Sequence, residues 1–320
     1  MMLKKSLLVL LIAAACTTVF AQQQLNGRTV ITGTPEQIAF SKGSFYMAPQ
    51  FSPDGRYLAF TNSSYKGINV KDLETGEIHR ITDEDAAGFG FEWSPDSKSI
   101  VTRVAKFENT KRLNAVKLFE VQTGIEKTLI DFKTFMPGLP RWNADGTKVY
   151  LFDGRDLSVK EAGSIPSKIK SDRKIVYTKD DQIFIGESLN QFNSIKPFNN
   201  QQYLNVNVSP DGAKVAFEVY GGNLYVMNTD GTGLIDYGKG YRPQWSADGK
   251  YITYMVTEDD GHAYTSSEIF IADVNSGQKI QLTDTDGLLE MSPSWSPDGK
   301  AIVYHEMNEG VIYLLPVQIN

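Results

Sequence analysis

The sequence predicts an all-β protein that folds as a β-propeller of four-stranded blades. Three observations lead to this prediction. A five-residue turn motif recurs six times, short β-prone segments follow each copy, and no segment shows helical periodicity. Units that recur about every 40 to 50 residues are typical of propeller blades, which protect their edge strands by stacking radially around a central channel.

The motif combines an aromatic or aliphatic residue, Ser or Asn, Pro or Ala, Asp, and Gly or Ser. Its copies are Phe51–Gly55, Trp93–Ser97, Trp142–Gly146, Val208–Gly212, Trp245–Gly249 and Trp295–Gly299. Pro presets one turn dihedral, Asp bonds to its own backbone and Gly accepts a positive φ, so the chain reverses here between two strands. We expect the recurring Ser residues to cap these turns. They are Ser52, Ser94, Ser209, Ser246 and Ser296.

Each motif is followed by the same succession of strands. In the first repeat a β-prone triplet, Leu58–Phe60, follows the turn, and a third strand comes after a loop at Ile68–Val70. A tight turn at Thr75-Gly76 then leads into a fourth strand that ends at Ile81–Asp83. With the segment before the motif as the first strand, each repeat supplies one four-stranded blade.

The number of blades depends on one eroded copy. Ile169–Arg173 resembles the motif and is followed by the β-prone segment Ile175–Tyr177. Counting this copy gives seven blades, the number that we favour, whereas discounting it gives six. The interval between Asp145 and Asp172 is too short for four full strands, so we expect an incomplete blade there.

The two ends of the propeller chain are expected to share a blade. Only two strands, Ile302–Tyr304 and Val311–Leu315, follow the last motif, which leaves that blade without its outer strand. The segment Arg28–Thr32 resembles the outer strands of the other repeats. We therefore expect this N-terminal strand to complete the last blade and close the ring.

Residues 1–21 have the pattern of an export signal, which leaves 22–320 as a single propeller domain. Lys4 and Lys5 precede a short apolar stretch, Leu7–Ala15, and Val19–Ala21 offers small residues for cleavage before Gln22. Lipidation at Cys16, after three alanines, is the alternative. No later segment is long and apolar enough to span a membrane.

Charge and cysteine content exclude several functions. The formal net charge is −6, from 32 Lys and Arg against 38 Asp and Glu, which argues against nucleic-acid binding because phosphate neutralisation needs clustered cations. Cys16 is the one cysteine. If cleavage follows Ala21, the mature protein has no disulfide, no thiolate metal ligand and no cysteine nucleophile.

The repeats resemble those of a known family. Trp-Ser-Pro-Asp-Gly-Lys at 295–300, with Pro two residues before the aromatic at Pro49, Pro243 and Pro293, is similar to the propeller repeats of TolB-like proteins. The resemblance covers about residues 40 to 320, and the separate N-terminal domain of TolB has no counterpart. It implies an exported, non-catalytic scaffold of the bacterial cell envelope, periplasmic or associated with the outer membrane, whose partner is an envelope protein or complex.

Similar repeats also form the propellers of oligogalacturonate lyases and those attached to prolyl-oligopeptidase-type hydrolases. The sequence has no Gly-x-Ser-x-Gly nucleophile elbow, so a hydrolase is not expected. The family resemblance to the lyases implies a metal held by histidines, but His79, His262 and His305 fall in different predicted elements. We expect no enzyme activity, cofactor or metal, and keep a polysaccharide-binding or lyase-like propeller with a glycan partner as the alternative.

Candidate partner-binding residues lie a few positions before the motifs, where strands begin at the channel mouth. They are Tyr46, Phe89, Tyr203, Tyr241, Arg242 and Met291. Exposed aromatic residues anchor many protein interfaces. The alternative is that these side chains pack between the blades.

Two long loops between the second and third strands carry opposite charges. Lys106, Lys111 and Arg112 make one loop basic, whereas Glu258, Asp259 and Asp260 make the other acidic. Such loops vary on a rigid scaffold and carry function. A rim with two charged poles is expected to orient a charged partner.

Overall fold

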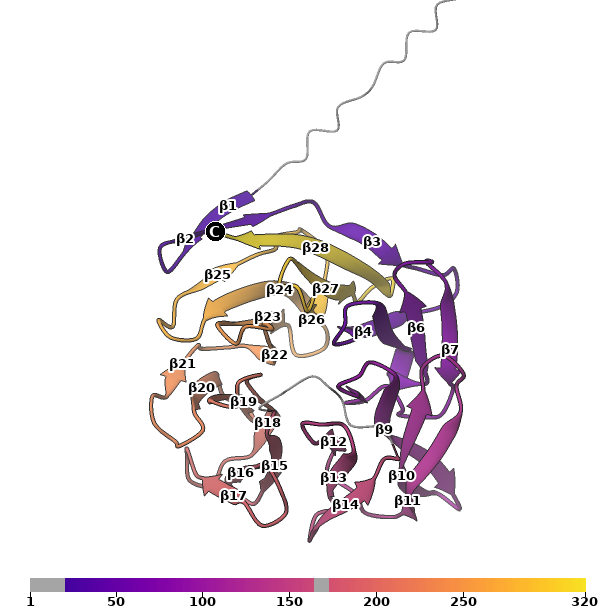
Figure 1. Cartoon of the computed structure of the whole chain (residues 1–320). Helices are drawn as coiled ribbons and strands as arrows, with labels where there is room; N and C mark the ends of the chain where they lie inside the picture. Colours follow the sequence, from indigo (N-terminus) through magenta and orange to yellow (C-terminus); the bar gives the residue numbers. More distant parts are fainter. Residues whose placement is uncertain (1–20, 164–172) are drawn as a thin grey trace, which may run out of the picture.

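The computed structural model describes residues 21–163 and 173–320, which form seven antiparallel sheets in a ring (Figure 1). The all-β propeller and the favoured count of seven blades are confirmed. We number the blades from the first motif and letter their strands A to D from the channel outward. One short 3-10 turn, Ser63–Tyr65 (η1), interrupts the first blade.

Four blades have four strands. Blade 1 contains β4 (Tyr46–Phe51), β5 (Tyr57–Asn62), β6 (Ile68–Asp72) and β7 (Ile78–Thr82). Blade 2 contains β8 (Glu92–Trp93), β9 (Ser99–Glu108), β10 (Lys111–Glu120) and β11 (Glu126–Lys133). Blade 5 contains β18 (Tyr203–Val208), β19 (Lys214–Val219), β20 (Leu224–Asn228) and β21 (Ile235–Asp236). Blade 6 contains β22 (Tyr241–Trp245), β23 (Tyr251–Asp259), β24 (Tyr264–Asp273) and β25 (Lys279–Gln281).

Blades 3 and 4 show three strands each in the part of the chain that is described. Blade 3 contains β12 (Arg141–Trp142), β13 (Lys148–Phe152) and β14 (Leu157–Glu161). Blade 4 contains β15 (Ile175–Lys179), β16 (Gln182–Gly186) and β17 (Phe192–Ile195). Within the described residues, the short interval after Asp145 thus supplies no fourth strand to blade 3. The eroded motif copy at 169–173 lies outside the described residues, except for Arg173.

Blade 7 joins the two ends of the propeller chain, as the sequence predicted. Its inner strands are β26 (Glu290–Trp295), β27 (Ala301–Glu306) and β28 (Val311–Ile319). The predicted closing strand is β2 (Arg28–Thr32), which pairs with the end of β28. The outer edge is longer than predicted, since β3 (Glu36–Ala39) pairs with the start of β28 and β1 (Ala21–Leu25) adds a further strand outside β2. The remainder of the predicted signal peptide lies outside the described residues.

The motif turns are held by the hydrogen bonds expected of their Ser and Asp residues. In blade 1 the Ser52 hydroxyl accepts the N–H of Tyr57 at 2.9 Å and donates to the carboxylate of Asp54 at 2.6 Å. Asp54 in turn accepts the N–H of Arg56. Blades 2, 5, 6 and 7 repeat this arrangement, and in blade 3 the amide of Asn143 replaces the hydroxyl.

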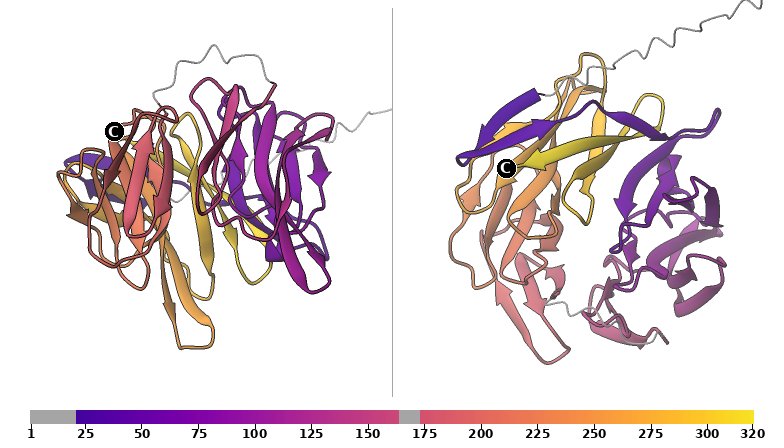
Figure 2. Two further views of the ribbon diagram at one scale, coloured as in Figure 1. Left: turned by 90° about the horizontal axis from the view of Figure 1, so that it is seen from below. Right: turned by 45° about the horizontal axis from the view of Figure 1, so that its top comes forward.

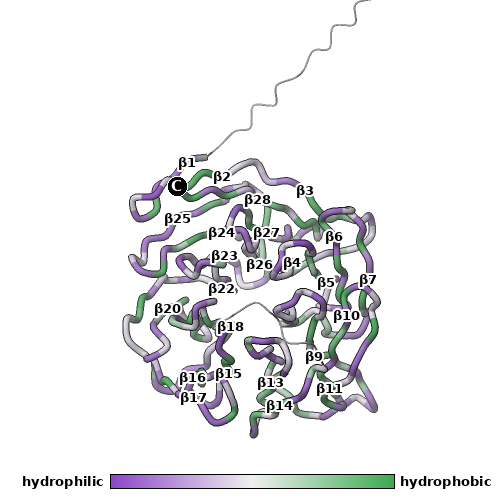
Figure 3. The backbone as a smooth tube through the Cα atoms, viewed as in Figure 1, coloured by the Kyte–Doolittle hydropathy of each residue, from purple (hydrophilic) through white to green (hydrophobic). Residues whose placement is uncertain are grey.

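The motif aromatics pack into the seams between blades. The indole N–H groups of Trp93, Trp142 and Trp245 each donate to a backbone carbonyl in strand A of a preceding blade, at 3.4, 3.2 and 3.0 Å. The buried apolar clusters likewise combine side chains of neighbouring blades. Figure 3 shows the hydrophobic stretches running along the strands of the ring. These seams stabilise the ring as one structure.

The two ends of the propeller differ in their connections. Because strands alternate in direction, the D-to-A and B-to-C connections lie at one end, which we call the loop face. The motif turns and the C-to-D turns lie at the other end, the turn face. The long hairpin of β23 and β24 projects from the loop face (Figure 2). Residues 21–163 and 173–320 contain no helix with the length and hydrophobicity to span a bilayer.

Candidate functional site

A recurring β-bulge shapes the wall of the central channel. In β4, β18, β22 and β26 the pairing register shifts three residues before the motif aromatic. The residues at the shift are not glycines, yet their φ angles are positive, between 49° and 55°. They are Ala48, Asn205, Arg242 and Ser292. A bulge re-aims side chains and leaves ladder groups unpaired, so it alters what each strand presents to the channel.

Side chains of the preceding blade accept the N–H groups that three of these bulges release. The N–H of Ala48 donates to Nδ1 of His305 at 3.4 Å, and that of Ser292 points to the sulfur of Met255 at 3.4 Å. The N–H of Arg242 donates to the carboxylate of Glu218. Each acceptor lies in strand B of its blade. These contacts fix the channel wall across the seams.

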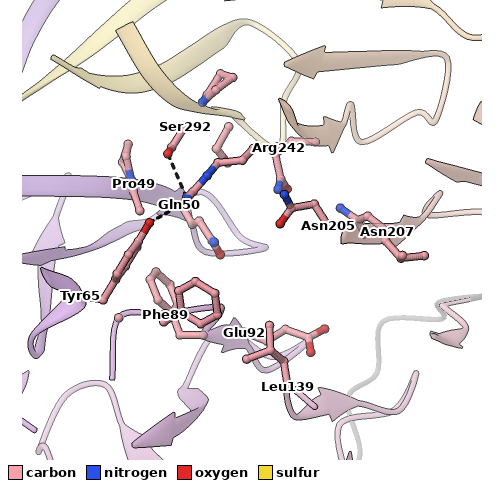
Figure 4. A pocket seen from close by; sticks show the side chains of 18 of the residues that line it. Pro49, Gln50, Tyr65, Phe89, Glu92, Leu139, Asn205, Asn207, Arg242 and Ser292 are labelled. Carbon is pink, nitrogen blue, oxygen red and sulfur yellow. Dashed lines mark hydrogen bonds between the residues drawn. The ribbon is translucent and has the colours of Figure 1, made fainter. Parts of the chain in front are cut away.

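The bulged strands surround a cavity of about 220 Å³ at the channel mouth. Its wall comes from strands or loops all around the ring, so that residues distant in sequence meet there (Figure 4). The charged residues of the described lining are Glu92, Arg141, Arg173 and Arg242. The mouth therefore carries more positive than negative groups, although the whole chain is acidic.

Glu92 is the carboxylate of this lining. One oxygen lies 2.9 Å from the guanidinium of Arg173, and the other lies 4.0 Å from that of Arg141. Glu92 also accepts the N–H of Trp142 at 3.2 Å. It thus joins blades 2, 3 and 4 at the channel wall.

Arg242 has a different environment. Its guanidinium donates to the Ser292 hydroxyl at 3.2 Å and to the Tyr65 hydroxyl, both neutral groups (Figure 4). The Tyr65 ring in turn makes an edge-on contact with Phe89, with ring centroids 5.1 Å apart. Arg242, Tyr65 and Phe89 therefore form a continuous polar and aromatic wall at the mouth.

Two buried ionisable groups lie behind the bulges. Burial raises the pKa of Glu218, although its bonds from the Arg242 N–H and from Asn205 favour the charged form. Burial, followed by the nearby charge of Arg242, lowers the pKa of His305 to about 3. His305 is therefore neutral at physiological pH and can accept the N–H of Ala48.

The structure separates the six predicted site residues into two groups. Phe89, which is exposed, and Arg242 lie at the channel mouth. The other four pack between strands or blades, which is the alternative reading of the sequence.

Contacts with the interior hold these four residues. Tyr46 is buried against Phe60, the hydroxyl of Tyr203 donates to the backbone carbonyl of Phe198, and Met291 is buried beside Ser267. Tyr241 is partly buried against the cluster between blades 6 and 7. Consequently these side chains form no aromatic ring at the mouth.

Apart from Phe89, the exposed aromatic residues lie elsewhere on the loop face. Within the described residues, every exposed Phe or Tyr is on a D-to-A connection or near the tip of a B-to-C connection. These residues are Phe40, Phe89, Phe107, Phe135, Tyr220 and Tyr264. Of these residues only Phe89 was predicted from the sequence, because aromatics in loops carry no repeat signal. Their positions beyond the ends of the predicted strands are the feature of the sequence that indicates exposure.

The two charged loops are the hairpins β9–β10 and β23–β24, both on the loop face. In the basic hairpin, Lys106 pairs with Glu108 at 2.6 Å and lies 4.2 Å from the Phe132 ring centre. In the acidic hairpin, Glu258 pairs with Lys239 at 3.1 Å. Part of each charge is thus compensated within the protein.

The three histidines lie in three different blades. His79 is in β7 and its ring lies 2.7 Å from the carbonyl oxygen of Val121, His262 is in the β23–β24 turn, and His305 is in β27. Among the described residues no group of three or more His, Cys, Asp and Glu side chains is placed to hold a metal ion.

Comparison with known proteins supports the TolB-like nature of the repeats. No family model matches the chain. The Tol-Pal system protein TolB of Francisella tularensis subsp. mediasiatica is 23% identical over 274 residues, which cover 78% of this chain and 54% of that protein. The chain thus spans about half the length of this curated relative.

Solved structures show the same fold. TolB from Acinetobacter baumannii matches with a TM-score of 0.57 at 17% identity, covering 84% of this chain and 62% of that chain. An oligogalacturonate lyase from Vibrio parahaemolyticus matches with a TM-score of 0.57 at 13% identity, covering 94% and 97%. The fold is that of a seven-bladed propeller. More particularly, the chain has a TolB-like propeller, as its repeats predicted.

Proposed function

We propose that the protein is exported and acts as a non-catalytic interaction module of the bacterial cell envelope, binding an envelope protein or complex through its loop face. The similarity to proteins named for the Tol-Pal system supports the envelope setting. We place the binding surface on the loop face because the exposed aromatic side chains are concentrated there. All six described examples lie on the loop face.

Aromatic rings at an exposed surface favour binding for a physical reason. They bury a large area at a low cost in side-chain entropy, and they dominate the energy of many interfaces. Exposed apolar residues at the turn face are aliphatic, such as Ile125, Leu189 and Leu234 in C-to-D turns. Isolated aliphatic residues of this kind are common on any protein surface.

The charged hairpins add a means of orienting the partner. Blades 2 and 6 lie on different sides of the ring, so their basic and acidic hairpins place opposite charges across the loop face (Figure 1). Complementary potentials mainly accelerate association and select orientation. Capture of the partner should therefore slow at high salt.

The test compares two matched surfaces. A variant that combines Phe107→Ser, Tyr220→Ser and Tyr264→Ser removes anchors from the loop face, whereas Ile125→Ser with Leu189→Ser alters the turn face. Both are compared with wild type in pull-downs from a membrane extract, after confirming equal melting temperatures. We expect proteins captured by wild type to be lost with the first variant and retained with the second. Identical captured proteins in all three samples would contradict the proposal.

One observation favours a second candidate, a glycan-binding or lyase-like propeller. The lyase from Vibrio parahaemolyticus matches the fold as well as TolB from Acinetobacter baumannii does, with a TM-score of 0.57 for each. Acidic oligosaccharides retained on a glycan array, or cleaved to unsaturated products by the purified protein, would support this candidate. Absence of both, together with partner capture through the loop face, would favour the interaction module.

A further inference from the structure

We propose that the channel mouth is a binding site for a carboxylate group, with Arg242 as the residue that holds it. The ligand is either a free small carboxylate or the acidic side chain of a peptide. This inference goes beyond the loop-face proposal because the site lies within the channel and depends on Arg242, which is not one of the loop-face aromatics.

The Arg242 guanidinium has no charged partner among the described residues. A guanidinium has five N–H donors and keeps its positive charge at physiological pH. Here it donates to two neutral hydroxyls, those of Tyr65 and Ser292. In the part of the chain that is described, no carboxylate lies within ion-pair distance of this guanidinium. A carboxylate ligand would supply the charge-assisted bonds that these hydroxyls cannot.

The nearest buried acid does not replace such a ligand. Glu218 accepts the main-chain N–H of Arg242 and the amide N–H of Asn205, both at Oε1, and thus bonds to the bulge and not to the guanidinium. Its contacts hold the backbone of Arg242 and leave the guanidinium facing the cavity. The opposite wall offers Glu92, which is already bonded to Arg173 and to the Trp142 N–H.

Cations outnumber carboxylates in the lining of the cavity. The described lining contains three arginines, Arg141, Arg173 and Arg242, and a single carboxylate, Glu92. The protein as a whole carries a net charge of −6. A local excess of cations within a low-dielectric channel focuses the potential and raises the concentration of anions there.

The cavity also has the size and the lining that a short carboxylate ligand requires. A volume of about 220 Å³ accommodates a ligand of side-chain size. Amide groups of Asn205, Asn207 and Gln244 line it, and Phe89 and Leu139 provide apolar walls. This combination fits a carboxylate on a short aliphatic stem, such as glutarate or a glutamyl side chain.

The site is also rigid before any ligand binds. The Arg242 backbone is fixed by the bulge and by Glu218, and Tyr65 is held against Phe89. A preorganised donor loses little entropy on binding. The wall thus holds the guanidinium in position for a ligand in the channel.

Calorimetry on the full-length mature protein tests the inference with two probes, glutarate and the blocked tripeptide acetyl-Ala-Glu-Ala-amide. We expect wild type to bind at least one of them at low salt. Arg242→Gln should weaken that binding by about tenfold or more, as expected for loss of a charged hydrogen bond. Arg80→Gln, which removes an equal charge from the exposed outer strand β7, should change the affinity by less than about twofold.

A second variant makes a prediction in the opposite direction. Glu92→Gln keeps an oxygen that can accept the Trp142 N–H but removes the one carboxylate of the described lining, which would repel an anionic ligand. We expect it to bind the probe more tightly than wild type. Tighter binding by a substituted protein cannot result from misfolding, so this variant remains informative if Arg242→Gln is unstable.

The outcomes separate the sources of the carboxylate and the two proposals. Preference for glutarate indicates a free small ligand, and preference for the tripeptide indicates a peptide side chain. Failure of wild type to bind either probe, equal binding of neutral glutaramide, or an equal loss in Arg80→Gln would overturn the carboxylate site. None of these results would contradict the loop-face proposal, whose readout is partner capture by the aromatic variants.

Discussion

Single residues at the blade seams stabilise the ring in two ways. Trp245 fills the seam between blades 5 and 6 and donates its indole N–H to the carbonyl of Asn207 at 3.0 Å. Trp295 is equally buried, but its indole nitrogen has no hydrogen-bond partner among the described residues. Among the tryptophans at the first position of the described motif copies, all four are buried, but hydrogen bonds are made by Trp93, Trp142 and Trp245 and not by Trp295.

Trp245→Ala is expected to lower the free energy of unfolding by about 3 to 5 kcal/mol, because it leaves a cavity in the seam. Tyr220→Ala, at an exposed position, serves as the control and should change stability by less than about 0.5 kcal/mol. Chemical denaturation of both variants measures the difference. Equal stability of Trp245→Ala and wild type would show that the seam does not depend on this side chain.

Glu290 is a buried acid whose protonation affects stability. Thr283 places its hydroxyl 2.7 Å from Glu290 and 2.8 Å from Glu268, but one hydroxyl can donate to only one of them. Burial, with Glu268 close by, raises the pKa of Glu290 to about 8. Because the unfolded pKa is about 4.3, the folded state binds more protons between these values and stability falls as the pH rises through them.

Glu290→Gln should remove this part of the pH dependence. The variant is expected to lose less stability than wild type between about pH 5 and about pH 8. His305, whose lowered pKa acts in the opposite direction and favours stability at higher pH, is present in both proteins and cancels in the difference. Urea denaturation across this pH range gives the comparison, and parallel curves would exclude a buried protonated Glu290.

At the residue scale, the sequence predicted the turns better than the channel. Ser52 and Asp54 bond as expected because the motif determines its own local geometry. Tyr46 and Met291 do not point as expected, because side chains alternate along a strand and the bulges at Ala48 and Ser292 interrupt that alternation. Neither Ala nor Ser marks a positive φ in a sequence, so the bulges could not be predicted.

At the scale of elements, closure of the ring depends on the N-terminal hairpin. Leu25 and Val30 are fully buried in the cluster between blades 6 and 7. Asn26 also bonds to Gln278 and Asp273 of blade 6, so the hairpin connects two blades. The sequence predicted β2 from its likeness to other outer strands, but β1 and β3 had no repeat partner to reveal them.

A chain that begins at Thr34 lacks both β1 and β2. We expect it to be less stable than the chain that begins at Gln22 by at least about 4 kcal/mol, given the loss of two buried aliphatic side chains. Backbone amides should exchange hydrogen faster across the whole domain, because the missing hairpin contacts both blade 6 and blade 7. An unchanged melting temperature would refute the closure.

At the scale of the whole molecule, the features that stabilise the propeller are separate from the surface that we propose for binding. Motif turns and seams repeat around the ring, whereas exposed aromatics and long charged hairpins are confined to the loop face. The sequence predicted this division because repeats determine the scaffold. It could not identify the aromatic residues that we propose for binding, since Phe107, Tyr220 and Tyr264 lie where the repeats diverge.

The central claim is that the loop face is the surface that binds the partner. Its most direct test places a photo-cross-linking amino acid at Phe107 on the loop face and, separately, at Ile125 on the turn face, followed by irradiation of intact cells. We predict a discrete protein adduct from position 107 and none from position 125. An adduct formed from position 125 alone, or equally from both positions, would contradict the claim.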